Sequence, residues 1–265
     1  MKKNKWFIGI VSMVCLTILS IVINQNVNAD PKPLTPELKS IKNKMENAID
    51  YYKHAKGSYI QTSSDGSVRK IEFEVNETEQ AGSKVKIYNT DNQLLRTTIS
   101  NHRQILIQDD VRKTYHISPV SEPAHQTPGI RKQMREGAPV YIYRPDPAAP
   151  GDSGTVSFPQ ALAFWMDEES RNFSITGSTK ILGREGIIIE GVSPFKNKAE
   201  KYKMIVDEQT GILLHFEAFD SKGNIALAVE VTELEIDAQS ALTQSFKLTA
   251  PEGYVDVTVH EKLIK

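Results

Sequence analysis

Residues 202–236 read YKMIVDEQTGILLHFEAFDSKGNIALAVEVTELEI, and this stretch decides how the rest of the chain is organised. Its alternating apolar residues predict three strands, joined by turns at Asp207–Gly211 and Asp220–Gly223. Each turn begins with an Asp, whose side chain accepts hydrogen bonds from backbone N–H groups, and ends with a Gly, which tolerates a positive φ. The stretch therefore predicts an antiparallel meander.

The apolar side chains of this meander predict a bent sheet with one apolar face. Four residues of the middle strand share that face: Ile212, Leu214, Phe216 and Ala218. In the third strand the apolar positions change parity between Val231 and Leu234, which predicts a bulge near Thr232 and Glu233. A curved meander with apolar residues on its concave side favours a hydrophobic hollow over a catalytic cleft.

Several residues of the stretch form a pattern that resembles the carboxyl half of the LolA-like family, the periplasmic lipoprotein carriers. The related RseB group of envelope-stress regulators shares it. The matching residues are Asp207, Thr210, Gly211, Leu214, Asp220 and Gly223. Gly57-Ser58-Tyr59 and the terminal pattern Phe246-x-Leu248-x-x-Pro251-x-Gly253 are also similar to this family. Over residues 36–260 the resemblance implies one α+β domain. Its sheet would be a strongly curved antiparallel half-barrel of about ten or eleven strands, with helices covering the concave face.

An amphipathic helix is predicted to open the fold. Thr35 suits the N-cap, Pro36 the first turn and Gly57 the C-cap. One apolar stripe runs along the helix, formed by Leu38, Ile41, Met45, Ala48, Ile49 and Tyr52. Further strands are predicted at 57–62, 71–75, 85–88, 94–100, 104–107, 114–117, 173–181 and 186–190, with one more near 254–259.

A proline-rich insertion is predicted at residues 119–159, which contain eight of the thirteen prolines of the chain. Regular strands are not expected there, because proline cannot donate to a strand ladder. Long irregular insertions in compact domains are typically lids or binding loops. Residues 160–171 follow as a predicted helix with Trp165 on its apolar side.

The amino terminus has the pattern of a bacterial signal peptide. Three lysines precede an uncharged apolar run from Trp6 to Ile23, and Val27-Asn28-Ala29 offers small residues for a signal peptidase. We expect cleavage between Ala29 and Asp30, which leaves a single domain at 30–265 outside the cytoplasm. An uncleaved membrane anchor is the alternative, since 18 residues just suffice to span a bilayer.

Composition excludes several classes of function. The only cysteine, Cys15, lies in the leader without a lipobox before it, so lipidation, disulfides and thiol chemistry are not expected. The formal net charge of −1, without a basic cluster, argues against nucleic-acid binding. The six histidines show no metal-binding spacing, and we expect no cofactor and no metal.

One motif resembles a catalytic one. Gly151-Asp152-Ser153-Gly154 matches the start of a serine-protease nucleophile motif, but Thr155 and Val156 do not continue it. Asp-Ser-Gly is also ordinary turn chemistry, and it lies here among prolines. We therefore expect a binding protein and not an enzyme.

The predicted function is extracytoplasmic binding of lipid acyl chains or of a lipidated protein by a monomer. Candidates for the lining of the hydrophobic pocket are Ile87, Leu106, Tyr115, Trp165, Phe173, Leu214 and Phe216. One alternative is an RseB-like regulator that holds a membrane anti-sigma factor. That resemblance is incomplete, because RseB-type proteins carry a second domain and this chain ends soon after Gly253. A structural module of the cell surface is the third possibility.

Overall fold

Helix α2 (Pro36–Glu46) begins as the sequence predicts. Thr35 Oγ1 accepts a hydrogen bond from the Leu38 N–H at 3.2 Å, and Pro36 occupies the first turn. The helix ends earlier than predicted, because Asn47 leaves helical geometry and a short 3-10 helix, η1 (Ala48–Asp50), follows. Gly57 consequently lies within a strand and does not cap the helix.

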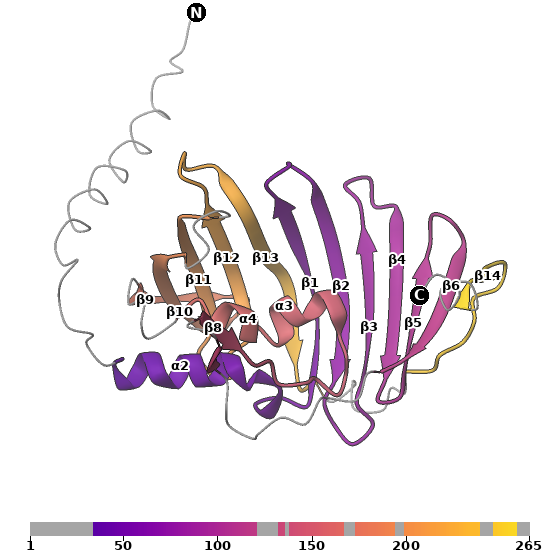
Figure 1. Ribbon diagram of the computed structural model, residues 1–265, viewed down its shortest axis with the longest axis horizontal. Helices are drawn as coiled ribbons and strands as arrows, with labels where there is room; N and C mark the ends of the chain where they lie inside the picture. The colour runs from indigo at the N-terminus through magenta and orange to yellow at the C-terminus, as the bar shows by residue number, and fades with distance from the viewer. Residues whose placement is uncertain are drawn as a thin grey trace, which may run out of the picture. The chain divides into compact units, whose positions relative to one another are not determined.

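The structure is a computed structural model, which describes residues 34–120, 132–135, 138–166, 173–193, 199–238 and 246–258 (Figure 1). The predicted leader and its cleavage site lie outside these residues. Among the described residues, no helix combines the length and the apolar character that crossing a bilayer requires.

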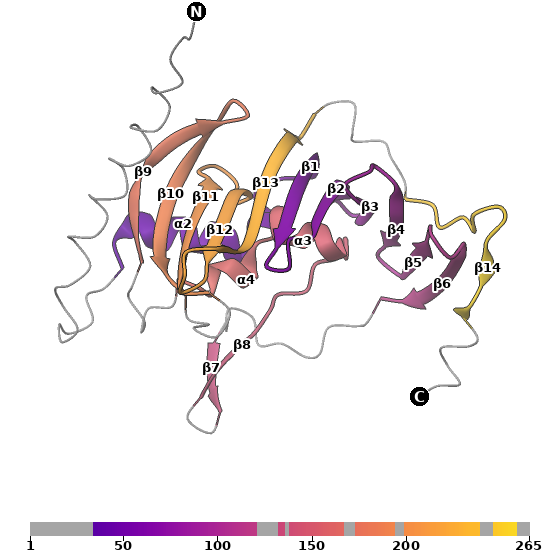
Figure 2. The ribbon, with the colours of Figure 1, turned by 90° about the horizontal axis from the view of Figure 1, so that it is seen from above.

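Twelve strands form one open sheet in the order β14-β6-β5-β4-β3-β2-β1-β13-β12-β11-β10-β9 (Figures 1 and 2). The first half of the chain contributes β1 (His54–Ser63), β2 (Val68–Asn76), β3 (Gly82–Tyr88), β4 (Leu94–Asn101), β5 (Gln104–Asp109) and β6 (Thr114–Pro119). The second half contributes β9 (Phe173–Ile181), β10 (Arg184–Val192), β11 (Lys201–Asp207), β12 (Leu213–Phe219), β13 (Ile225–Ile236) and β14 (Val255–Asp256).

The sheet has more strands than expected and is mixed. Neighbouring strands pair antiparallel except β14, which runs parallel to β6 because the C-terminal segment returns along that edge. The meander of residues 202–236 is confirmed as β11, β12 and β13. Both of its predicted turn glycines, Gly211 and Gly223, have a positive φ, of 78° and 81°.

The two halves of the sheet join where β1 pairs with β13. Ser58 pairs with Glu233 and Tyr59 with Val231, so Thr232 is the extra residue of a bulge. The bulge is stabilised by the Thr232 hydroxyl, which donates to the Ser58 carbonyl at 3.1 Å. The bulge predicted from the change of apolar parity is therefore confirmed.

The helices pack against one face of the sheet, which we call the covered face. Buried residues of α2, α3 (Gly154–Ser157) and α4 (Gln160–Ala163) join one apolar core with residues of the sheet. A second 3-10 helix, η2 (Gly151–Ser153), contacts β2 and β3, and α3 contacts β12. Figure 1 shows α3 and α4 in front of the central strands.

Two expectations for residues 119–171 are wrong in part. Strands β7 (Lys132–Arg135) and β8 (Ala138–Tyr141) form a separate hairpin, visible in Figure 2. Pro139 is tolerated there because a two-stranded hairpin has an outer edge on each strand. Helix α4 has only four residues, since the Trp165 N–H bonds to Leu162 in a tighter turn. Residues 167–171 of the predicted helix lie outside the described part.

Candidate functional site

Three aromatic rings meet on the covered face. Trp165, in the turn after α4, packs edge-on against Tyr202 of β11 and Phe216 of β12, with ring centroids 5.3 Å apart in both cases. Tyr202 and Phe216 stack at 6.5 Å on the paired strands β11 and β12. The tyrosine and phenylalanine rings are buried, whereas Trp165 is only partly buried at the margin of the core.

Four of the seven residues predicted to line a pocket lie in or against the apolar core of the covered face. Ile87 and Phe216 belong to it, and Trp165 and Phe173 pack against it. The other three, Leu106, Leu214 and Tyr115, are outside the core cluster. The structure thus brings together the predicted residues of β3, β9, β12 and the turn after α4.

Leu214 is displaced from the core by a register shift between β11 and β12. Ile205 pairs with His215 and Val206 pairs with Leu213, so the pairing skips Leu214. Leu213 therefore joins Phe216 in the core. Leu214 is buried elsewhere, near Gly186, where a Cβ added to the glycine would lie 3.3 Å from Leu214 Cδ1. The predicted alternation across Leu214 and Phe216 is interrupted by this shift.

Leu106 and Tyr115 lie on the opposite face of the sheet. Leu106 pairs with Ile99, and Ile99 pairs with Lys84, so these side chains share a face with the charged residues of β3. Tyr115 pairs with Gln108, two residues along the strand from Leu106, and so points the same way. The sequence alternation does not reveal this, because both faces of β5 carry apolar residues.

Residues 142–166, which we call the strap, contain η2, α3 and α4 and lie across the covered face. Buried hydroxyls hold its backbone: Tyr59 donates to the Asp152 carbonyl at 2.8 Å, Ser83 to Ala148 at 3.0 Å and Tyr52 to Ser157 at 3.3 Å. Two ion pairs add to these, Arg96 with Asp152 and Arg144 with Asp50. Sequence reasoning missed these contacts, because no motif marks a hydroxyl that meets a distant carbonyl.

The strap also contributes apolar side chains to the core. Val156, Leu162 and Ala163 are buried there, together with Phe158 and Met166. The strap therefore covers apolar residues of the sheet with apolar residues of its own, while hydrogen bonds and ion pairs fix its position.

Ser153, the residue of the protease-like motif, is buried inside the strap. Its hydroxyl donates to the Pro150 carbonyl at 3.1 Å, and its own carbonyl accepts a hydrogen bond from the Ser157 hydroxyl at 3.0 Å. These contacts close the short helical turns η2 and α3. The predicted turn is in fact helical, and the serine side chain stabilises its backbone.

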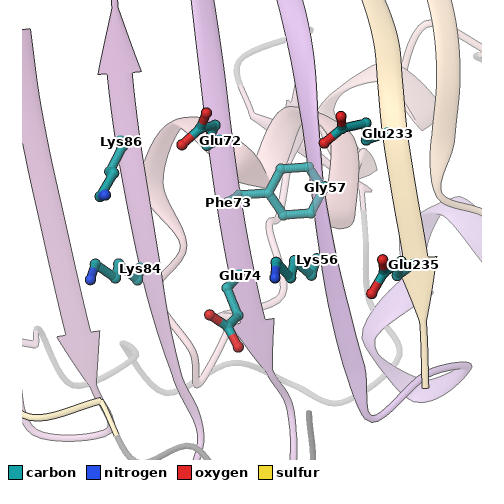
Figure 3. Close-up of a pocket in the computed structure, with 9 residues that line it drawn as sticks. All are labelled: Lys56, Gly57, Glu72, Phe73, Glu74, Lys84, Lys86, Glu233 and Glu235. Atoms are coloured by element: carbon teal, nitrogen blue, oxygen red, sulfur yellow. The ribbon is translucent and has the colours of Figure 1, made fainter. Parts of the chain in front are cut away.

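The opposite face carries a lattice of alternating charges around a hollow of about 380 Å³ (Figure 3). By strand register, one row across four strands reads Lys84, Glu74, Lys56 and Glu235. Opposite charges on neighbouring strands stabilise each other modestly. Within this lattice, a hydrogen bond from Lys70 lowers the pKa of Glu72. The hollow presents three lysines and four glutamates, so it suits water and ions better than an acyl chain.

A second hollow, of about 300 Å³, lies beside the strap at β4–β6. Ile107 pairs with Thr98, which pairs with Val85 of the core, so this hollow opens on the covered face. Its lining residues are both apolar and charged: Leu95, Arg96, Ile107, Asp109, Arg112, Thr114, Tyr115, His116 and Val257. Tyr115 is among them although strand register directs its side chain to the opposite face. Arg96 also pairs with Asp152 of η2, so the hollow and the strap share a residue.

No family model and no curated protein matches this sequence. Solved structures that resemble the chain include the MucA/MucB complex of Pseudomonas aeruginosa, at 12% identity and a TM-score of 0.43 over 77% of this chain and 58% of that chain. Lipoprotein LppX of Mycobacterium tuberculosis is 10% identical, with a TM-score of 0.39 over 82% and 100% of the two chains.

A putative outer membrane lipoprotein-sorting protein domain from Vibrio parahaemolyticus is 12% identical, with a TM-score of 0.29 over 76% of this chain and 92% of that chain. This chain thus spans less than two thirds of the matched MucB chain. With TM-scores below 0.5, these likenesses give no information on what this chain binds.

Proposed function

We propose that this protein binds an acyl chain, of a lipid or of a lipidated polypeptide, outside the cytoplasm and without catalysing a reaction. In this proposal the sheet is a half-barrel, the covered face is its concave side, and the strap is a movable cover. The ligand then lies between the strap and the aromatic residues Tyr202 and Phe216, and extends toward the hollow at β4–β6.

The observation that supports this proposal best is the way the strap is attached. Its backbone is held by a few hydroxyl donors and two ion pairs, while its own inward side chains and the surface beneath it are apolar. Lifting the strap would leave Phe216 and Ile87 facing water. A hydrophobic ligand that takes the place of the strap removes that cost, whereas a polar ligand does not.

Magnitudes favour a long acyl chain. Three neutral hydrogen bonds contribute about 3 kcal/mol, and the four large buried side chains of the strap, Val156, Phe158, Leu162 and Met166, contribute about 8 kcal/mol, so lifting the strap costs roughly 11 kcal/mol. Burying about sixteen methylenes gains about 13 kcal/mol, and burying about eight gains only about 6 kcal/mol. Long chains can therefore displace the strap, and short chains cannot.

The test is native mass spectrometry of protein purified from its own host, followed by displacement with fatty acids of graded length. We expect a co-purified lipid, and we expect chains of about sixteen carbons, but not of about eight, to replace it. Protein that carries no lipid and takes up neither length would contradict the proposal.

A second candidate function is the binding of a protein partner, such as the membrane anti-sigma factor of an RseB-like regulator. One observation favours it: β9, nine residues long, is one of the two edge strands of the described sheet and carries few charges. Exposed strand edges can pair with an extended segment of another protein. Substituting Thr176→Pro in β9 would abolish such a complex and leave acyl-chain binding unchanged.

A further inference from the structure

Two carboxyl groups meet where the strap passes the end of β2. Glu77 directly follows β2, and its N–H donates to the Lys53 carbonyl at 2.8 Å. Asp146 belongs to the strap, where its Oδ1 accepts a hydrogen bond from the Ala148 N–H at 2.8 Å. Ala148 is in turn the residue whose carbonyl accepts from Ser83. The pair therefore adjoins one of the anchoring points of the strap.

The remaining oxygens of these two groups require a proton between them. Glu77 Oε1 and Asp146 Oδ2 are buried, and neither has a donor among the described residues. Each carboxyl group shifts the pKa of the other, which places the two side chains side by side. Because an ionised carboxylate can only accept hydrogen bonds, such a pair forms only when one of the two groups is protonated.

The charged surroundings of the pair are themselves mostly acidic. Arg144 is the nearby cation, and its guanidinium is shared with Asp50 through hydrogen bonds of 2.5 Å and 2.7 Å. Asp237, after β13, accepts the N–H groups of Lys53 and His54. The charged groups that act on Glu77 are Asp146, Arg144 and Asp50. The Tyr52 hydroxyl lies near Glu77, Asp146 and Asp237, and His54 is turned toward Glu74.

These surroundings keep the proton on the pair. Burial, and then the negative charge of Asp146, raise the pKa of Glu77 far above the usual carboxyl range. Burial also raises the pKa of Asp146. At neutral pH the protonated Glu77 therefore donates to the Asp146 carboxylate, and the buried site contains one negative charge and not two.

We propose that Glu77 and Asp146 form a proton-dependent latch that fastens the strap to the end of β2. While the shared proton is present, the hydrogen bond holds the strap closed. When the proton is lost, two carboxylates with buried oxygens face each other, and their repulsion shifts the strap toward the open state. This inference concerns the strap itself and does not depend on what ligand the covered face binds.

The sign of the pH effect follows from linkage. The closed strap keeps a proton that an exposed Glu77 would release, so its stability is complete below the ordinary carboxyl pKa and is lost as pH rises toward the raised pKa. Within that window the ratio of open to closed strap rises by up to about tenfold for each pH unit. The strap is therefore held most firmly in neutral or acidic surroundings and is loosened by alkalinisation.

The experiment follows Trp165 fluorescence between pH 6 and pH 9.5 in a Trp6→Phe background, where Trp165 is the remaining tryptophan of the chain. Because Trp165 packs against Tyr202 and Phe216, release of the strap shifts its emission to longer wavelength. Glu77→Gln abolishes this shift, because the amide donates to Asp146 without a titratable proton. Asp146→Asn abolishes the shift in the same way, and this second variant tests the proposal if Glu77→Gln does not fold.

Glu79→Gln is the matched control, because Glu79 is exposed two residues away and the alkaline shift should persist in that variant. Far-UV circular dichroism, recorded in parallel, should stay constant through the transition, since only the strap moves. The proposal is overturned if a folded Glu77→Gln or Asp146→Asn protein shifts like the parent. It is also overturned if the parent shows no shift, or if secondary structure is lost together with the shift.

Discussion

Gly211 lies directly against the backbone of Lys44 at the end of α2. A Cβ at Gly211 would be 2.6 Å from the Lys44 carbonyl oxygen and 2.7 Å from the Met45 nitrogen. Lys44 strengthens the contact, because its ammonium group donates to the Glu208 carbonyl at 2.5 Å. The turn between β11 and β12 is therefore the point where the opening helix docks on the sheet.

Gly211→Ala should destabilise the fold strongly. Alanine in the left-handed region costs roughly 1–2 kcal/mol, and the backbone clash with α2 should bring the loss to about 3 kcal/mol or more. Urea unfolding followed by circular dichroism measures this loss. Gly223→Ala is the matched control, because Gly223 has φ +81° but open space around it. This variant should lose only the unfolding free energy that alanine costs in the left-handed region, without the cost of a clash. Equal losses in the two variants would show that α2 does not pack on the turn as described.

Asp207 should make the same turn sensitive to acid. Burial on its own would raise the pKa of Asp207, but hydrogen bonds from Arg184 at 2.6 Å and from Thr210 at 2.7 Å outweigh it, and the pKa is lowered. A carboxyl group with a lowered pKa stabilises the fold above its unfolded pKa, and this stability is lost as pH falls through the folded pKa.

Asp207→Asn should therefore reduce the unfolding free energy at pH 7 by about 3–5 kcal/mol, because Arg184 loses its partner. Below about pH 4 the gap in unfolding free energy between variant and parent should narrow, because the Asp207 carboxylate of the parent becomes protonated. Asp220→Asn, at the exposed second turn, is the control and should change stability far less at either pH. A gap that stays constant down to pH 2 would contradict the role assigned to the Asp207 charge.

Local chemistry explains why this part of the fold is predictable from sequence. Both turns of the meander are specified by an Asp that caps the backbone and a Gly with positive φ, and both appear where expected. The bulge at Thr232 is visible as a change of apolar parity. In each case the determining contacts lie within a few residues of each other along the chain.

Long-range contacts explain what could not be predicted. The register shift that places Leu213 and not Leu214 in the core depends on pairing with β11, and sequence alternation contains no sign of it. The position of Asp146 between two prolines identifies a loop but gives no hint of Glu77, its partner at the end of β2. The parallel pairing of β14 with β6 is equally non-local.

Tyr59→Phe should loosen the strap without unfolding the sheet. The substitution removes the donor to the Asp152 carbonyl and should cost about 1 kcal/mol of the free energy that holds the strap closed. Acrylamide quenching of Trp165, in the Trp6→Phe background, should increase. Tyr88→Phe is the matched control, because the Tyr88 hydroxyl donates to Glu72 on the opposite face of the sheet. Quenching of Trp165 in this variant should stay at the parent level. Equal quenching in all three proteins would argue against the Tyr59 contact as an anchor of the strap.

A charge on the covered face should abolish binding of a long acyl chain, whereas a charge on the opposite face should not. Ile107→Glu places a carboxylate in the hollow at β4–β6, where a covering acyl chain would remove water from the charge. Ile99→Glu is the matched control: Ile99 is also half-buried and lies on the neighbouring strand, but it faces the same side as Lys84.

In the Trp6→Phe background, titration with a fatty acid of about sixteen carbons should change Trp165 emission saturably in the parent and in Ile99→Glu. Ile107→Glu should weaken this response at least tenfold, since even about 1.4 kcal/mol of lost binding free energy has that effect. Thermal melts establish that both variants are folded, and a folded Ile107→Glu protein with parental affinity would place the acyl chain elsewhere.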